Sequence, residues 1–170
     1  NPITDMDPKS KSLAVAEYFI KKSQLENRPI TNKKLQKLLY YAQAWSLVLN
    51  DKKIFNDSIE AWVHGPAIPV IYAEFKKFGF GNIDTKVDEK DFIALSPEDK
   101  VVLDDVWKIY GKYEADYLEV LTHSEGPWQK ARSGIAADES SSNEISADSM
   151  KEYYGQKLEE AKEGRKVDKG

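Results

Sequence analysis

The chain has 170 residues, of which 41% are apolar and 32% are charged, and its formal net charge is −4. This length suits one domain with a modest appendage, and this apolar fraction is too high for a wholly disordered chain. The absence of cysteine excludes structural disulfides, thiolate metal sites and cysteine nucleophiles, and it fits a cytoplasmic protein.

The N-terminal residues are polar and lack the apolar region of a signal peptide. We therefore expect residues 1–12 to be a disordered leader, with Met6 as a candidate natural start. No apolar run approaches the ~20 residues that a membrane span needs. The sequence predicts a soluble, cytoplasmic protein with no membrane partner.

Charge is unevenly distributed along the chain. Residues 1–50 hold 8 Lys and Arg against 4 Asp and Glu, which leaves 17 against 25 for the remainder. An acidic rear half can speed association with a cationic partner, although so mild a balance is also typical of ordinary solvated surfaces.

Two amphipathic helices open the predicted fold. Apolar residues recur at three- and four-residue spacing through residues 11–24, which predicts a first helix. Pro29 interrupts this pattern, and Thr31 can cap a second helix that starts at Asn32. That helix carries apolar and aromatic residues on most of its surface, so we expect it to be the central helix of the core.

The segment after Asn50 changes to short extended runs. Residues 54–55 and 59–63 flank a polar turn at 56–58, which predicts a small β-hairpin that leans on the helices. A third helix is expected between Pro69 and Phe78, before a glycine-rich stop. The predicted fold class is mainly α, a compact multi-helix domain with a small β-hairpin after the second helix.

The rear of the chain is also predicted to be helical. A cap at Ser96 and a proline after it predict a helix through Tyr110, and shorter helices follow at 113–121 and from Gly126. Composition turns acidic and serine-rich from Gly134. We expect a helical domain over 13–133, a flexible acidic linker over 134–145, and a polar C-terminal helix and tail over 146–170. The last helix should pack weakly, because its sizeable apolar residues are few: Tyr153, Tyr154 and Leu158.

The two histidines lie in similar turn-like segments, Trp62-Val63-His64-Gly65-Pro66 and Thr122-His123-Ser124-Glu125-Gly126-Pro127-Trp128. One interpretation makes either histidine a general base that Glu125 or Asp116 orients. Because the chain has no nucleophile elbow and no glycine-rich phosphate loop, we favour a structural role, in which the imidazoles bond to backbone and pin the turns. A metal site of two histidines and carboxylates would lack a preformed ligand face, so no metal and no cofactor is expected.

Lysines cluster at the start of the second helix, at Lys33, Lys34 and Lys37. They suggest either a helix-turn-helix that binds DNA or a solvated basic face. The sequence pI near 5.3 and the apolar character of this helix argue against its lying in a DNA groove, so a nucleic-acid partner is not expected.

With these segments in hand, the chain resembles the Panacea domain family from Leu13 to Arg132. Four ordered blocks carry the resemblance, and together they are specific: TNKKLQKLLYYAQAW (31–45), IEAWVHGP (59–66), VIY followed by FKKFG (70–79) and LTHSEGPWQKA (121–131). The residues that this resemblance marks as structural or partner-binding are Lys37, Tyr40, Tyr41, Trp45, Trp62, His64, Gly65, Pro66, Tyr72, Thr122, His123, Glu125, Pro127 and Trp128.

The resemblance implies a mostly helical antitoxin without enzymatic activity. Such antitoxins neutralise a cognate protein toxin, often an inhibitor of translation, by direct binding. Two alternatives stay open, namely an adaptor that delivers the toxin to a cellular protease and a DNA-binding regulator of its own operon. We expect toxin contact in the rear half, where the acidic segment and the polar last helix offer adaptable surface. Homo-oligomerisation is also left open.

Overall fold

The computed structural model describes residues 10–169, and the side chains of residues 10–165. The elements in chain order are α1 (Lys11–Leu25), α2 (Asn32–Asn50), β1 (Glu60–Trp62), β2 (Gly65–Ala67), α3 (Pro69–Phe75), the 3₁₀ helices η2 (Lys76–Phe78) and η3 (Glu89–Phe92), α4 (Pro97–Tyr110), α5 (Ala115–His123), α6 (Gly126–Ala131) and α7 (Ala147–Lys169). The prediction of a mainly α fold with a small hairpin after the second helix is confirmed. No helix within the described range is long and apolar enough to cross a membrane.

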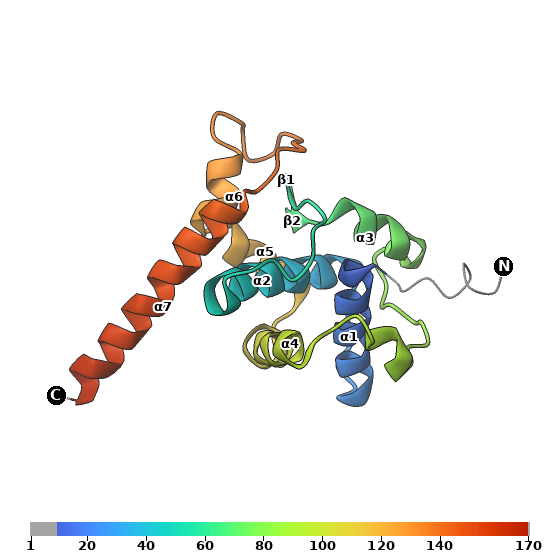
Figure 1. The fold of residues 1–170 in the computed structure, drawn as a ribbon. Helices are drawn as coiled ribbons and strands as arrows, with labels where there is room; N and C mark the ends of the chain where they lie inside the picture. The colour runs from blue at the N-terminus through green and yellow to red at the C-terminus, as the bar shows by residue number, and fades with distance from the viewer. Residues whose placement is uncertain (1–9, 170) are drawn as a thin grey trace.

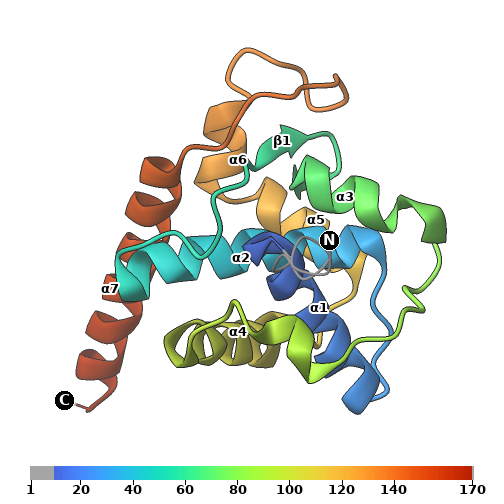
Figure 2. The ribbon, with the colours of Figure 1, turned by 45° about the vertical axis from the view of Figure 1, so that its right-hand side comes forward.

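α2 is the central helix, and α1, α4, α5, α7 and β2 all pack against it (Figure 1 and Figure 2). Its first turn is capped by Thr31, whose hydroxyl accepts a hydrogen bond from the Lys34 amide at 3.2 Å. Between Asn32 and Ala44 every side chain except that of Lys33 is buried. The expectation that this helix is the central helix of the core is confirmed, and its aromatic and apolar residues cover most of its circumference.

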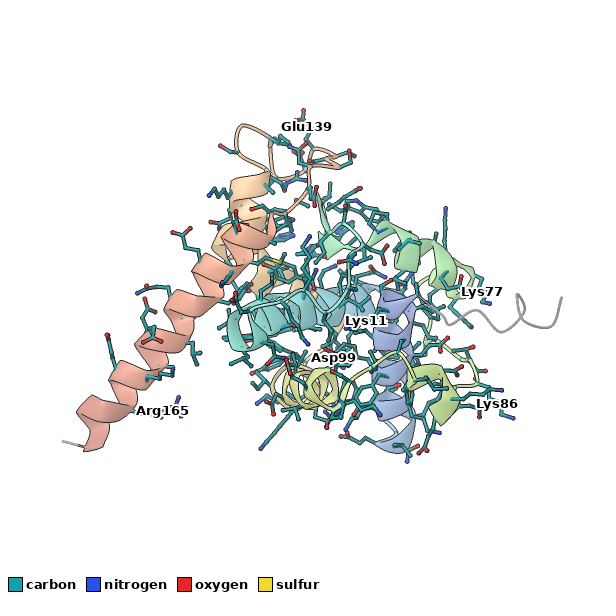
Figure 3. All side chains as sticks on the ribbon, viewed as in Figure 1. Lys11, Lys77, Lys86, Asp99, Glu139 and Arg165 are labelled. Atoms are coloured by element: carbon teal, nitrogen blue, oxygen red, sulfur yellow. The ribbon has the colours of Figure 1, made fainter. Side chains whose placement is uncertain are left out.

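Polar contacts fix the helices that flank α2. Ser96 and Asp99 form a reciprocal capping box at the start of α4. Lys11 at the start of α1 reaches the same carboxylate, with Nζ 2.9 Å from Oδ2 of Asp99 (Figure 3). Residues 1–9 of the expected leader lie outside the described residues, and α1 begins at Lys11 after a cap by Ser10.

The hairpin pairs different segments from those expected. β1 and β2 are antiparallel, with Glu60 opposite Ala67 and Trp62 opposite Gly65. The turn is therefore formed by Val63 and His64, and the expected pairing of 54–55 with 59–63 around a turn at 56–58 is wrong.

A side chain of α2 explains why residues 54–55 form no strand. Oε1 of Gln43 accepts from the Ile54 amide at 2.8 Å, and Nε2 of Gln43 donates to the Phe55 carbonyl at 2.8 Å. These bonds satisfy the backbone groups that a neighbouring strand would otherwise bind. A single glutamine from α2 thus replaces strand pairing for this segment.

The segment after α6 returns to the hairpin. The Ala61 amide donates to the Asn143 carbonyl at 2.8 Å, and the Ile145 amide donates to the Ile59 carbonyl at 2.8 Å. Arg132 is buried and donates to the carbonyls of Ala61 at 2.9 Å and Ala136 at 2.8 Å. The acidic segment is therefore attached at both of its ends.

α7 packs firmly on α2 over its first half, and the expectation of weak packing is wrong there. Tyr154 is fully buried and Met150 is 2% exposed. From Glu159 to Arg165 every side chain is exposed. Figure 1 shows this outer half running away from the body of the molecule, and Figure 3 places Arg165 there. The helix thus has a core half and a solvated half.

Candidate functional site

A groove of about 900 Å³ opens beside the first turns of α2. Its walls come from α2, the turn between β1 and β2, α3 with η2, the start of α5, and the segments at residues 79–80 and 140–141. The helices among them can be followed in Figure 2. Five of the motif residues line it: Lys37, Trp62, His64, Gly65 and Tyr72. Its volume lies within the range of ~300–1,000 Å³ that is usual for ligand pockets. Three separate sequence blocks therefore meet in one concavity.

The hairpin turn approaches α2 so closely that only glycine fits at position 65. Gly65 has a φ of +106°, and a Cβ there would lie 2.5 Å from Cε of Lys37 and 3.0 Å from Oγ1 of Thr122. Such a φ is rare for residues with a side chain. Thr122 is itself buried on α5. Close packing around Gly65 therefore holds the turn, α2 and α5 together at the floor of the groove.

Lys37 is a buried amine in that floor. Its side chain is 3% exposed, and Nζ donates to the Pro66 carbonyl at 3.1 Å. Burial lowers the pKa of Lys37 to about 7, and the positive charge of Lys33 acts in the same direction. The ammonium form of Lys37 is therefore less stable here than in water, because burial removes its hydration.

The rim of the groove carries ion pairs of Lys33 on α2 with α5, and a polar contact of His64 in the turn with α5. Nζ of Lys33 lies 2.9 Å from Asp116 and 2.5 Å from Glu119. Nδ1 of His64 lies 3.2 Å from the same Glu119 oxygen. Burial opposes ionisation of Glu119, but the bond from Lys33 and the charges around it lower its pKa overall. Both rim carboxylates are thus already engaged by cations of the chain.

The lysine cluster does not form an exposed basic face. Lys34 and Lys37 are 4% and 3% exposed, and Lys33 is paired as described above. Nζ of Lys34 donates to the Gly111 carbonyl at 2.6 Å. Both interpretations of the cluster, a DNA-binding surface and a solvated face, are wrong, because two of the three amines bond to backbone carbonyls inside the fold.

The two histidine segments lie together. His123 stacks on Trp128 with ring centroids 3.9 Å apart, and Nε1 of Trp128 donates to the Trp62 carbonyl at 2.8 Å. Burial lowers the pKa of His123, against the opposing influence of Glu119 and the backbone of Val63. His64, by contrast, is 74% exposed. The indole of Trp128 therefore connects the two histidine-containing segments, and the ring of His123 packs against one face of that indole.

The orienting carboxylates of the general-base interpretation are used elsewhere. Glu125 accepts hydrogen bonds from the hydroxyls of Tyr41 at 2.6 Å and Tyr154 at 3.0 Å. Asp116 is bound by Lys33. The arrangement that would make either histidine a base oriented by Glu125 or Asp116 is therefore not formed.

The remaining aromatic motif residues build what we call the tyrosine cluster, which lies in the core around Glu125. Its members are Tyr40, Tyr41, Trp45, Tyr110 and Tyr154. Tyr41 stacks on Tyr110 with ring centroids 3.9 Å apart, and the hydroxyls of Tyr40 and Tyr154 are 2.9 Å apart. Pro127 begins α6 at the edge of this region. The motif residues thus divide into a groove set and a core set.

Sequence reasoning missed two members of the tyrosine cluster and one part of the groove. Tyr110 and Tyr154 lie outside the four motif blocks, although both contact motif residues. Phe80 lines the groove and its side chain is fully exposed. The sequence signal that could have pointed to Phe80 is its position between two glycines, Gly79 and Gly81, because an aromatic residue in such a segment has few neighbours to cover it.

The buried carboxyl of Glu125 gives a prediction about pH. Burial raises the pKa of Glu125 above its ordinary 4.5. The native state then keeps this proton to higher pH than the unfolded chain, so its contribution to stability is complete below about pH 4.5 and is lost as pH rises through the native pKa. In Glu125→Gln the free energy of unfolding should not show this loss, and the variant should gain on the wild type as the pH rises above about 4.5.

Urea unfolding across this pH range measures the difference between the two proteins. Glu152→Gln, which changes an exposed glutamate of α7, is the matched control and should follow the wild type. Parallel pH profiles for the wild type and Glu125→Gln would contradict the prediction.

Two comparisons with known proteins found a match. The family model described as "Antitoxin SocA-like, Panacea domain" matches residues 35–129. The chain is 33% identical over 144 residues to Antitoxin SocA of Caulobacter vibrioides (strain NA1000 / CB15N), and this match covers 78% of this chain and 76% of the relative. No solved structure matches the chain. The resemblance inferred from the four blocks is confirmed, and the chain belongs to the SocA-like antitoxin family that carries the Panacea domain.

Proposed function

We propose that this protein is the antitoxin of a toxin–antitoxin pair, and that it neutralises a cognate toxin in the cytoplasm by direct binding and without catalysis. Membership of an antitoxin family and the identity of 33% to an antitoxin support this role. The observation that carries the binding mechanism is the open groove, in which motif residues from three sequence blocks meet. Its floor is locked by packing, so binding there would cost little conformational entropy.

Phe80 extends the proposed contact beyond the groove. Its side chain is fully exposed, and it lines the same groove as Trp62 and Tyr72. An exposed aromatic side chain beside a preformed pocket is typical of an interface anchor. We expect the toxin to cover the groove and Phe80 together.

The outer half of α7 is a second candidate contact, as its polar composition predicts. Removing the chain from Ser140 onward would not test this contact, because it would also remove the buried Met150 and Tyr154. A truncation after Leu158 removes only exposed side chains among those described. This shorter truncation separates toxin contact from folding.

The experiment is co-expression of the product of the neighbouring gene with the full chain, followed by growth measurement and co-purification. Rescue of growth with a stable complex is the expected result. Phe80→Ser should weaken the complex by about 30-fold or more, as loss of an interface anchor does. Ile93→Ser, at a residue 80% exposed that does not line the groove, is the control and should bind normally.

The truncation after Leu158 completes this experiment. Full binding by the truncated chain would support the groove as the main contact, and loss of binding would move the contact to the rear half. Rescue without any complex would contradict direct neutralisation. A shorter lifetime of the toxin in cells would then point to the adaptor alternative.

A further inference from the structure

Lys37 is a buried amine whose hydrogen-bond donors are only partly used by the described chain. The ammonium group has three donors, and the Pro66 carbonyl accepts one of them. Within residues 10–165, no carboxylate oxygen lies within ion-pair distance of its Nζ. The charge of Glu119 acts on it from farther away, but that carboxylate is bound by Lys33 and His64. A buried cation with unused donors is costly unless a partner supplies acceptors.

The rest of the groove also has an excess of positive charge. Lys76 lines it from η2 and forms no ion pair with the described residues. The only acidic residue among the lining residues that the structure describes is Asp116, which Lys33 binds at 2.9 Å. The lining therefore holds three lysines, Lys33, Lys37 and Lys76, against Asp116, with Glu119 at the rim, although the chain as a whole carries −4. Such a site complements a negatively charged ligand.

Aromatic side chains flank this cationic floor. The ring of Trp62 meets that of Tyr72 edge to face at 5.0 Å, and Phe80 lies in the same lining. These rings favour an apolar group beside the negative one. A nucleic-acid backbone would instead call for several exposed cations spaced along its phosphates. The combination fits a peptide better than it fits DNA or RNA.

We propose that the groove receives an acidic side chain of the toxin, flanked by apolar residues, and that Nζ of Lys37 binds its carboxylate. The proposal rests on the antitoxin function, because it identifies the part of the toxin that the groove recognises. The carboxylate would take the unused donors of Lys37, and the neighbouring apolar side chains would lie against Trp62 and Tyr72. The buried amine and the aromatic rings of the groove then each have a counterpart in the ligand.

Lys37→Met is a suitable variant because it should fold. The native pKa of about 7 lies below the ordinary 10.5, so the unfolded chain binds this proton more tightly. This difference lowers the free energy of unfolding. The loss is complete below about pH 7, and it shrinks as the pH rises to about 10.5. Methionine removes that cost and leaves only the Pro66 carbonyl without its donor. Lys34→Met is the matched control, since Lys34 is an equally buried lysine that bonds to Gly111 outside the groove.

The first test titrates the isotope-labelled full chain with two peptides, acetyl-Phe-Glu-Phe-amide and acetyl-Phe-Gln-Phe-amide. NMR signals of the Gly65 and Gly79 amides report on the groove, and those of Gly155 and Gly164 on α7 serve as references. The glutamate peptide should shift the groove signals with at least about 10-fold higher affinity than the glutamine peptide. Lys37→Met should abolish this preference, and Lys34→Met should keep it.

Other outcomes of the titration would overturn the proposal. They are equal affinity of the two peptides, a preference that survives in Lys37→Met, or no shift at Gly65 up to about 10 mM peptide. Stronger binding of acetyl-Phe-Phe with a free C-terminus would overturn it as well, since the groove would then select a chain terminus.

The second test uses the co-expressed toxin. Lys37→Met should weaken the complex by about 30-fold or more, and unchanged toxin binding would overturn the proposal. The peptide titration contains no toxin, so it stands even if the neighbouring gene fails to encode one. Failure of the proposed function and failure of carboxylate recognition are therefore separate results.

Discussion

Replacement of Tyr154 by alanine is expected to lower the free energy of unfolding by about 4–6 kcal/mol. Loss of a buried aromatic ring costs about 3–5 kcal/mol, and the lost hydroxyl adds about 1 kcal/mol because Tyr40 and Glu125 lose a partner. The ring of Tyr154 is fully buried and packs on Tyr40, Tyr41 and Trp45. Since domains of this kind are stable by roughly 5–15 kcal/mol, this loss would be a large fraction of the total stability. Urea unfolding followed by circular dichroism measures the change.

Two variants provide the controls for this result. Tyr154→Phe keeps the ring and should cost about 1–2 kcal/mol, which isolates the hydroxyl. Tyr153→Ala changes the neighbouring, half-buried ring and should cost less than Tyr154→Ala. Equal losses for the two alanine variants would show that α7 does not contribute to the core through Tyr154.

The second large effect is expected at the hairpin turn, where Gly65→Ala should cost about 2–5 kcal/mol. A non-glycine residue at a φ of +106° is strained by roughly 1–3 kcal/mol. Overpacking adds about 1–3 kcal/mol, because the new Cβ would lie 2.5 Å from Cε of Lys37. Thermal or urea unfolding of the variant measures the sum of the two costs.

A control glycine and a double variant separate strain from crowding at the turn. Gly134 has a φ of +82° and no atom within 4 Å of a built Cβ, so Gly134→Ala should show strain without crowding. Combining Gly65→Ala with Lys37→Ala should recover part of the loss. Strict additivity of these two substitutions would argue that Lys37 is not what opposes a side chain at position 65.

Local sequence signals were enough to predict where α2 and α4 begin. The hydroxyls of Thr31 and Ser96 bond to amides three residues later, which is the short-range geometry that a cap pattern encodes. The apolar face of α2 was equally visible, because its period repeats over many residues. These features depend on neighbours along the chain.

Long-range polar contacts explain the errors. Gln43 binds the backbone of Ile54 and Phe55, and no periodic pattern announces such a contact. Tyr154 is buried because an aromatic face of α2 lies open to it, which the sparse apolar content of α7 does not reveal. The four motif blocks named important residues, but their division between a groove and a core cluster depends on tertiary packing alone.

The lysines at the start of α2 show the same limit for the candidate site. Lysine is almost always exposed, so a cluster of three is expected to be a charged surface. Two of them instead reach backbone carbonyls at Gly111 and Pro66, residues that lie 77 and 29 positions away. Only tertiary packing buries these two lysines and places Lys37 in the floor of the groove.

The place of α7 also has a consequence for the order in which the protein is made. Tyr40 and Tyr154, whose hydroxyls meet, are 114 positions apart, and domains form only when the contacting segments have left the ribosome. During synthesis the aromatic face of α2 must therefore wait uncovered until the end of the core half of α7 has emerged. A chain interrupted before that point would expose the sides of Tyr40, Tyr41 and Trp45 that Tyr154 covers, the kind of surface that chaperones hold and proteases remove. Incomplete copies would thus be cleared before they accumulate.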